Sequence, residues 1–591
     1  MRIIPALTLC CSLLTISALS QPSATIRFSL QFSSVTPRHD IGIRGNTPPL
    51  SWDKTYPLTD ADGDGIYEAE IIFTQPPPYN VLEYKYLHQE KWEQSGNRCL
   101  FFDLPSGTKR PTDVWAKPAV LSPSDVPALP SEKLLQDYRL AVEAYLALHP
   151  GLERYQSLAE IKEHFQRLEP YFQRELDIRQ AYLAFSKLTA GIRCGHTYAN
   201  FYNQPTHIQQ LVFDQPDKLP FCFRLLDRRM ILTDNLSEDN RLVTGTEIKA
   251  INGVPVGRIL DSLLTVVKAD GDNDGKRLKD LEVIGLGRFE SFDIYFPLFF
   301  PPQNGVYQLE AHSPNSDLPL QCTVKAVSRS ERKALLNNRL EKTEPLMDEL
   351  WQFEIRQDSI AYLQLGTFVT WQMKMDWKDF LNQAFEEINR KKIPYLVIDI
   401  RGNEGGNDEV GLELAKYLAR QEVRMEPSRT LTRYAVLPEK LAPFLSSWDN
   451  SFRDLSKATS PIGNGWFLLK EKVSDKFPRQ KNAFQGQVYL LVDAANSSAT
   501  FYLSKIMKES RLATLIGQTT GGSLQGINGG QTAFLRLPHS GIELDIPLFG
   551  TFFDSKLGGG IEPDITVSPT VQDIITGNDP VWKAVLESIR K

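Results

Sequence analysis

The fold of the chain is decided by the stretch Val488-Tyr-Leu-Leu-Val-Asp-Ala-Ala-Asn-Ser-Ser-Ala-Thr500. Its first five residues form an apolar run that predicts a buried strand, and apolar side chains recur at helical spacing from Ala499 onward. Ser497 and Ser498 therefore lie where a strand ends and a helix begins. A hydroxyl at such a point projects from rigid backbone beside free amide donors, which suits a reactive group. The alternative is that one of these serines only caps the helix.

Two further apolar strands, Ile360–Leu365 and Tyr395–Ile400, precede this stretch, and helical patterns separate the three. Alternating strands and helices predict right-handed crossovers and a mainly parallel sheet over residues 346–591. Ligand sites of such sheets collect at the carboxyl ends of the strands. The loop Arg401-Gly-Asn-Glu-Gly-Gly-Asn407 follows the second strand as Ser498 follows the third, so we expect both at one edge.

Residues 131–215 show helical patterns and end in a segment that carries His196. A proline-rich linker over residues 118–130 precedes them. The eight histidines are scattered, and no pair has the helical spacing of metal ligands, which argues against a histidine-based metal site.

Residues 216–345 contain Leu242-Val-Thr-Gly-Thr-Glu-Ile-Lys-Ala-Ile-Asn-Gly-Val-Pro-Val256, which resembles the strand-turn-strand of PDZ domains. That resemblance implies capture of extended peptides at a sheet edge. Two stretches are expected to lack regular structure: the charged, glycine-rich segment 270–287, and the segment from about 419 to Gln485.

Six short motifs in the chain stand in the order seen in serine peptidases of the C-terminal processing and tricorn-core family, which the chain resembles from about residue 131 to its end. They are Gly195-His-Thr197, Ile398-Asp-Ile-Arg-Gly-Asn-Glu-Gly-Gly406, Ser498-Ala-Thr500, Ile516-Gly-Gln-Thr-Thr-Gly-Gly522, Leu537-Pro-His-Ser-Gly541 and Gly560-Ile-Glu-Pro-Asp564. The resemblance implies a multidomain protein with a helical domain, a PDZ-like domain and a C-terminal α/β catalytic domain. It implies a serine-type peptidase that acts on proteins or peptides without a cofactor.

The resemblance places the nucleophile at Ser498, with Ser497 as the competing candidate. In the processing branch of the family the base is a lysine in the loop after Thr520, where this chain has Ser523. In the tricorn branch the base is a histidine of the helical domain, and His196 matches it. An imidazole with an ordinary pKa of ~6.5 suits a base that works near neutral pH.

The same resemblance implies an oxyanion hole made by the backbone amide of Ala499 and one amide from Gly405 or Gly406. Such a hole stabilises the negative charge that develops when the hydroxyl attacks a peptide carbonyl. We therefore expect acyl transfer through these residues.

The chain departs from the tricorn pattern at the groups that orient the histidine. Gly195 stands where that branch has a serine, and Leu557 stands where it has a glutamate. Asp554 and Glu562 are the candidates for a replacement acid. The second hypothesis is therefore a protein of the same fold that binds peptides or glycans without cleaving them.

Residues 22–117 alternate apolar and polar residues between proline, glycine and aspartate clusters, which predicts a β-sandwich of short strands. Three segments resemble the starch-binding carbohydrate module: Ile43-Arg-Gly-Asn-Thr-Pro-Pro-Leu-Ser-Trp-Asp53, Glu83-Tyr-Lys-Tyr86 and Trp92-Glu-Gln-Ser-Gly-Asn-Arg98. The resemblance implies that Trp52 and Trp92 stack on sugar rings. The alternative is that both indoles pack within the domain, which then serves as a scaffold.

Asp60-Ala-Asp-Gly-Asp-Gly65 looks like the start of a calcium loop, with Asp60, Asp62 and Asp64 as candidate ligands. The twelfth position of that loop is Ile71 rather than a glutamate. An acidic hairpin turn is the competing interpretation.

Residues 1–20 have a positive charge at Arg2, an apolar run and small residues before a cut at Gln21, which predicts a signal peptide and an exported, periplasmic or extracellular protein. The alternative is an uncleaved anchor; no later stretch is apolar enough to span a bilayer. A net charge of -6 gives no electrostatic footprint for nucleic acid. Removal of the signal peptide would take away Cys10 and Cys11 and leave four cysteines, none of which shows the spacing of zinc ligands. Cys222 and Cys322 either form a disulfide or remain free thiols.

Overall fold

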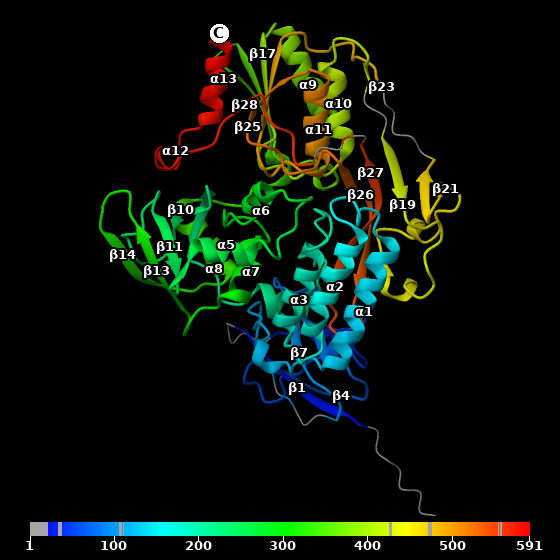
Figure 1. Cartoon of the computed structure of the whole chain (residues 1–591). Helices are drawn as coiled ribbons and strands as arrows, with labels where there is room; N and C mark the ends of the chain where they lie inside the picture. The colour runs from blue at the N-terminus through cyan, green and yellow to red at the C-terminus, as the bar shows by residue number, and fades with distance from the viewer. Residues whose placement is uncertain are drawn as a thin grey trace, which may run out of the picture. The chain divides into compact units, whose positions relative to one another are not determined.

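The computed structural model describes residues 22–590 except 33–37, 106–108, 110, 358, 425–427, 471–475, 554, 556 and 557. The predicted signal peptide lies outside the described residues. The chain is multidomain and divides into two compact units, residues 1–121 and 122–591 (Figure 1).

The first unit is built from two sheets. A three-stranded sheet has the order β4 (Ile66–Phe73), β1 (Ala24–Gln31) and β8 (Thr112–Val114). The second sheet has the order β3 (Tyr56–Pro57), β2 (Ile41–Gly45), β5 (Val81–His88) and β6 (Lys91–Trp92), with β7 (Arg98–Phe101) also paired to β5. Alternate residues of β1 are buried, so the period-two pattern in the sequence defines the face that packs into the core.

A charged cluster lies inside this first unit. The guanidinium of Arg98 binds Glu93 at 2.8 Å and Asp113 at 2.9 Å, and Arg98 itself is 1% exposed. The hydroxyls of Tyr84 and Tyr86 donate to the same Asp113. Because each charge has a partner, the cluster avoids the large penalty of an isolated buried ion.

The second unit begins with three helices, α1 (Ser131–Leu148), α2 (Leu158–Phe172) and α3 (Ile178–Ala190). Ser157 and Asp177 close capping boxes at the starts of α2 and α3, so the sequence sets both helix boundaries. A short turn α4 (Thr206–Ile208) follows and continues into a π-helical turn at Gln209–Phe213.

A six-stranded antiparallel sheet comes next along the chain. Its order is β14 (Pro319–Lys325), β13 (Val306–His312), β11 (Glu247–Ile251), β10 (Arg229–Asn235) and β9 (Phe221–Leu226), with β12 (Val254–Pro255) paired to β11. Helices α5 (Val256–Leu263), α7 (Ser291–Phe299) and α8 (Arg329–Leu340) accompany it. The expectation of a loop over 270–287 was wrong in part, because Asn273 caps a helix there, α6 (Asp274–Asp280).

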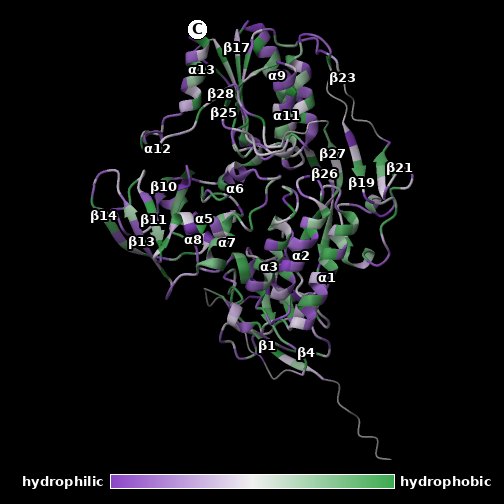
Figure 2. Ribbon diagram, in the orientation of Figure 1, coloured by the Kyte–Doolittle hydropathy of each residue, from purple (hydrophilic) through white to green (hydrophobic). Residues whose placement is uncertain are grey.

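The third sheet is mainly parallel. Its order is β15 (Trp351–Arg356), β16 (Ile360–Leu365), β17 (Tyr395–Asp399), β24 (Gln487–Val492), β25 (Thr514–Gly517) and β28 (Ile565–Thr566), and only β15 runs antiparallel to its neighbour. Figure 2 shows its central strands as largely apolar, as expected for strands covered on both faces.

Helices cover both faces of this sheet, and the alternation of side chains along each strand explains how. One face, with Leu396 and Leu490, packs against α9 (Trp377–Arg390), α10 (Asp408–Leu418) and α11 (Ser498–Glu509). The other face, with Val397 and Leu491, packs against α13 (Pro580–Arg590), which follows α12 (Val571–Thr576). Figure 1 shows α13 on one side of the sheet and α9–α11 on the other.

The stretch from 419 to Gln485, which we expected to be irregular, instead contributes strands to a further sheet. Its order is β20 (Leu445–Ser446), β26 (Gly526–Arg536), β27 (Glu543–Phe552), β19 (Arg429–Thr432), β22 (Trp466–Leu469) and β21 (Thr459–Gly463), and β18 (Val423–Arg424) pairs with β23 (Lys476–Phe477). These strands are short and lack a clear apolar alternation, so their pairing with the long β26–β27 hairpin determines them.

The β26–β27 hairpin joins the helical part to the mainly parallel sheet. The hydroxyl of Tyr145 in α1 donates to the carbonyl of Asp545 at 3.2 Å, and the amide of Asp545 donates to the carbonyl of Tyr198 at 3.0 Å. The hairpin therefore contacts the same segment that carries His196.

Cys99, Cys194, Cys222 and Cys322 are free thiols, so Cys222 and Cys322 do not pair. No helix within the described residues has both the length and the apolar character needed to cross a bilayer.

Candidate active site

Ser498 is the first residue of α11 and follows the end of β24 by a five-residue turn. Its backbone has φ +52°, a left-handed conformation that residues with a side chain rarely adopt. Such a conformation costs of order 1–3 kcal/mol and persists only where the surroundings enforce it. A strained serine between a strand and a helix presents its hydroxyl outward, as the nucleophile elbow of other hydrolases does.

Buried polar side chains enforce this turn. Asn496 is fully buried and donates to the carbonyl of Ile400 at 2.5 Å and to that of Asn403 at 3.0 Å. The hydroxyl of Thr500 donates to the same Asn403 carbonyl at 2.9 Å. The turn of Ser498 and the glycine-rich loop after β17 are thus tied together, at one edge of the sheet as the sequence predicted.

His196 lies beside Ser498 although the two are 302 positions apart in the chain. The Nε2 atom of His196 is 3.2 Å from the Oγ atom of Ser498. This distance is within reach for proton transfer between a serine and a base. The structure therefore brings together the two residues that the sequence singled out.

The residues on both sides of His196 are held in place. The amide of Gly195 donates to Asp270 Oδ1 at 3.0 Å, and Lys268 Nζ donates to the Gly195 carbonyl at 3.0 Å. On the other side, His149 Nδ1 accepts the amide of Gly151 at 3.0 Å, so its proton lies on Nε2, which donates to the Thr197 hydroxyl at 2.9 Å.

The environment of His196 favours its neutral form. The pKa of His196 is lowered to about 4, mainly by burial, with the positive charges of Lys268 and Lys276 acting in the same direction and the negative charge of Asp270 opposing them. Burial likewise lowers the pKa of His149 to about 3. At neutral pH both imidazoles are therefore uncharged, and Nε2 of His196 is free to accept a proton.

Gly405 lies against the serine turn, and Gly406 lies against Phe368, more closely than a residue with a side chain could. A Cβ atom at Gly405 would lie 2.9 Å from the Cβ atom of Ser498, and one at Gly406 would lie 2.3 Å from the carbonyl oxygen of Phe368. Both glycines also have positive φ angles, +111° and +137°. Backbone amides can approach the serine only because these side chains are missing.

The two glycine amides differ in their partners. The amide of Gly405 already donates to Asn403 Oδ1 at 2.9 Å. Ala499 is the second residue of α11, where a backbone amide has no partner within the helix. Of the two glycines, Gly406 is therefore the better placed to offer a free donor beside Ala499.

Helix α6 contacts all three loops around Ser498. Lys276 binds Glu404 of the glycine-rich loop at 3.1 Å and also Asp280, and Lys279 lies 3.5 Å from Asp493. Asn273, the cap of α6, donates through Nδ2 to the carbonyls of Thr520 and Gly522 at 3.0 and 3.1 Å. No motif in the sequence predicts the contact between α6 and these loops. The sequence signal closest to it is the high proportion of charged residues in segment 270–287.

Lys276 does not replace the lysine that serves as base in the processing branch of the family. Burial acts to lower its pKa, but Asp280 and Glu404 outweigh burial and raise it above the ordinary value. Lys276 therefore stays protonated. It lines a cavity of about 50 Å³ with His196, Lys268, Asp270, Glu404 and Ser497.

Residues 359–567 match the family model described as peptidase family S41. These residues belong to peptidase family S41. The chain is a serine-type peptidase, a hydrolase whose substrates are proteins or peptides.

Two solved structures of CPAF share the fold. Mature CPAF complexed with lactacystin is 14% identical, with a TM-score of 0.54 over 78% of this chain and 98% of that chain. Mature CPAF is 13% identical, with a TM-score of 0.52 over 78% and 97%. The photosystem II D1 C-terminal processing protease is 13% identical over 76% and 98%, with a TM-score of 0.34.

The other candidates in the S41 domain are less favourably placed. Ser497 directs its hydroxyl to the carbonyl of Glu404 at 3.2 Å rather than to His196. Glu562 is exposed and accepts the Thr519 hydroxyl at 2.9 Å. Asp554, and the leucine at 557, lie outside the described residues.

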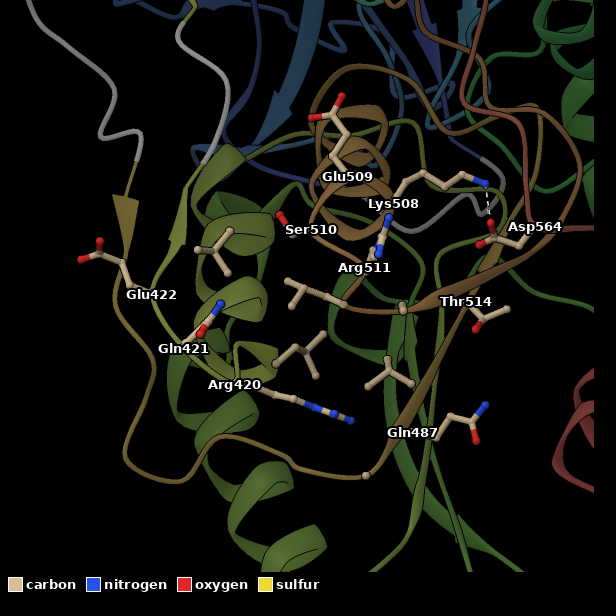
Figure 3. Close-up of a pocket in the computed structure, with 16 residues that line it drawn as sticks. Arg420, Gln421, Glu422, Gln487, Lys508, Glu509, Ser510, Arg511, Thr514 and Asp564 are labelled. Atoms are coloured by element: carbon tan, nitrogen blue, oxygen red, sulfur yellow. Dashed lines mark hydrogen bonds and ion pairs between the residues drawn. The ribbon is translucent and has the colours of Figure 1, made fainter.

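A large hollow of about 1390 Å³ lies at the far end of α11 in the S41 domain (Figure 3). Its lining includes Arg420, Arg511 and the ion pair between Lys508 and Asp564. It lies at the opposite end of α11 from Ser498, so its side chains do not reach that hydroxyl.

In the first unit, Trp52 and Trp92 lie together. Their ring centroids are 6.1 Å apart and the planes are tilted by 59°, and Trp92 is 41% exposed. The guanidinium of Arg44 lies 5.4 Å from the Trp92 ring. The two indoles therefore form a partly exposed aromatic pair rather than a buried one.

The ligand atoms of Asp60, Asp62 and Asp64 lie within 4.8 Å of one another. Asp60 accepts the amides of Gly63 and Gly65 at 2.8 and 3.0 Å, as in an acidic turn. Asp62 and Asp64 accept the amides of Asp64 and Ile66 in the same turn, at 3.4 and 2.8 Å.

Proposed function

We propose that the chain is an exported serine endopeptidase that hydrolyses peptide bonds through an acyl-enzyme on Ser498, with His196 as general base. The observation that carries the proposal is the 3.2 Å distance between His196 Nε2 and Ser498 Oγ. The low pKa of His196 and the strained backbone of Ser498 support it. Export rests on the predicted signal peptide alone.

In the first step, Ser498 Oγ attacks the carbonyl carbon of the peptide bond while His196 Nε2 takes the hydroxyl proton. The carbonyl π electrons move to oxygen and form a tetrahedral oxyanion. When the oxyanion collapses, the C–N bond breaks and His196 returns the proton to the leaving amine. A water molecule then repeats the sequence on the ester and releases the acid.

The oxyanion is stabilised by the amides of Ala499 and Gly406. Ala499 stands at a helix start, where unpaired amides favour negative charge. The amide of Gly405 is engaged by Asn403, so we assign Gly405 to the shape of the hole rather than to its donors. Removal of one such donor typically costs ~10²–10³ in rate.

A fluorophosphonate probe tests the proposal directly, because it reacts with an activated serine and not with an ordinary one. We expect one label on the folded wild-type protein, mapped by mass spectrometry to Ser498. A folded protein that takes no label would favour the second hypothesis, a protein that holds peptides without cleaving them. A label on Ser497 would reassign the nucleophile.

The pH dependence of activity follows from the pKa of His196. The base acts in its neutral form, so kcat/KM should fall on the acid side with a midpoint near the folded value of about 4. A base with an ordinary imidazole pKa of ~6.5 would give an acid-side midpoint about 2.5 pH units higher. The measurement is kcat/KM on a peptide substrate from pH 3.5 to 8.

This profile requires a control for unfolding. His149 and His196 both have folded pKa values below the unfolded value, so protons bind the unfolded chain better and stability falls as the pH drops below ~6.5. Circular dichroism at each pH separates this loss from titration of the base. A midpoint near 6.5 in folded protein would contradict the proposed environment.

A second function, glycan binding by the first unit, is favoured by the exposed pair Trp52 and Trp92. Indole faces pack against the apolar C–H faces of sugars, and Arg44 and Lys85 beside Trp92 add hydrogen-bond donors. Changing Trp52 and Trp92 to alanine should abolish retention on a starch column. Trp115 to alanine serves as the aromatic control, because this ring stacks on Phe32 inside the same unit. Absence of retention in the wild type would end the idea.

The sheet of β9–β14 is the proposed PDZ-like domain, within the predicted boundaries 216–345. Its role would be to hold an extended peptide near the active site.

A further inference from the structure

The second ring nitrogen of His196, Nδ1, needs a hydrogen-bond acceptor if the ring is to act as a base. For Nε2 to accept the proton of Ser498, the ring must carry its own proton on Nδ1. That atom is buried, and no partner for it is present among the described residues. In triads of this kind an acid at that position fixes the tautomer and stabilises the imidazolium.

Asp270 is the acid that the fold brings closest to this requirement. It is 3% exposed, lines the same small cavity as His196, and its negative charge acts on the imidazole against burial and two lysines. The amide of Gly195, the residue before His196, donates to its Oδ1 atom at 3.0 Å.

Because Gly195 has no side chain, the carboxylate of Asp270 has room beside the histidine segment. A Cβ atom on Gly195 would lie 3.0 Å from Asp270 Oδ2 and 3.3 Å from its Cγ atom. A larger residue at this position would press on the carboxylate. The glycine that departs from the tricorn pattern is thus the residue that allows Asp270 to approach.

The backbone around Asp270 is fixed to the histidine segment by further contacts. The amide of Gly271 donates to the carbonyl of Arg193 at 2.9 Å. Lys268 Nζ binds the Gly195 carbonyl. Segments 268–272 and 193–195 therefore move as one piece, and the carboxylate is pre-positioned rather than recruited.

We propose that Asp270 is the positioning residue that orients His196 and stabilises its protonated form during catalysis. This inference rests on the proposed function. The carboxylate acts on the Nδ1–H of the ring, and this hydrogen bond forms in the substrate complex, since catalytic hydrogen bonds commonly tighten only when substrate is bound. The acid comes from the chain between β11 and β13 and not from the S41 domain.

Three substitutions at Asp270 distinguish an effect of its negative charge from a purely structural role. Asp270→Asn keeps an oxygen for the Gly195 amide and removes the negative charge, whereas Asp270→Ala removes both. Asp270→Glu restores the charge on a longer side chain. Asp272→Asn is the matched control, since that carboxylate is 84% exposed and pairs only with Arg193 among the contacts described.

We expect Asp270→Asn and Asp270→Ala to lose about 10²–10⁴ in kcat, with KM within about threefold of the wild type, because loss of an orienting aspartate affects the transition state. The rate of fluorophosphonate labelling should fall in parallel, and Asp270→Glu should recover part of it. Asp272→Asn should behave as the wild type. An Asp270→Asn protein with kcat within about threefold of the wild type would overturn the inference. A loss of kcat in Asp270→Ala but not in Asp270→Asn would also overturn it, because it would indicate a purely structural role.

If the variants do not fold, the wild-type protein answers the question. NMR of the protein with ¹⁵N-labelled histidine, inhibited by the fluorophosphonate, should show the His196 ring protonated on Nδ1 with a downfield proton. A ring with its single proton on Nε2 would overturn the inference. Failure of the proposed function is recognised separately, because the wild type would then neither cleave peptides nor take the label on Ser498.

Discussion

Replacing Ser498 by alanine will reduce peptide hydrolysis by a factor on the order of 10⁴–10⁶, the loss seen when a serine nucleophile is removed. The side chain makes no packing contribution beyond one hydroxyl, and its backbone is held by Asn496 and Thr500, which remain. The fold should therefore survive, with an unchanged circular dichroism spectrum. The measurement is kcat/KM on a peptide substrate together with labelling by the fluorophosphonate.

Ser497→Ala is the matched control. The neighbouring hydroxyl is 3.2 Å from the Glu404 carbonyl and supplies no contact to His196, so its loss should leave most of the activity and all of the labelling. If Ser497→Ala abolishes hydrolysis and Ser498→Ala does not, the nucleophile is the other serine.

Replacing His196 by alanine will cause a loss of similar size, about 10⁴–10⁶ in kcat, because the Ser498 hydroxyl then has no base. The double variant with Ser498→Ala should be no slower than either single variant, since serine and histidine act as one unit. Additive losses in the double variant would contradict the pairing of the two residues. The same kcat measurement on the three variants decides it.

His539→Ala is the control for the histidine. That ring is on the surface of the hairpin end and binds Gln136 Oε1 at 2.8 Å. It takes no part in the site, and activity should be unchanged. A large loss in this variant would indicate that the assay responds to the stability of the hairpin.

Much of the α/β part could be predicted from the sequence because local pattern and fold agree there. The apolar runs at 360–365, 395–400 and 488–492 are strands, and the residues after the last two meet at one edge. Buried parallel strands are continuous apolar runs, so short-range periodicity is sufficient to find them.

The contact between His196 and Ser498 was predicted by resemblance and not by pattern. No periodicity relates residues 302 positions apart, and only the tertiary fold brings them to 3.2 Å. The orienting acid was missed for the same reason. Asp554 and Glu562 were chosen near a motif in sequence, whereas Asp270 reaches Gly195 from a different part of the chain.

The sequence did not predict helix α6, because contacts with distant residues stabilise it rather than its own local pattern. A segment of seven residues, five of them charged, does not predict a helix by itself. Their lysines instead find partners in the loops of the S41 domain, Glu404 and Asp493.

The docking of α6 has a consequence for the order in which the chain matures. The serine, the imidazole and the surrounding charges come from three stretches of sequence, and the stretch with the serine is synthesised after the other two. A nascent or partly folded chain thus carries no competent centre, and nearby polypeptides are safe until assembly is finished. Peptidase activity therefore begins only after these stretches have folded together.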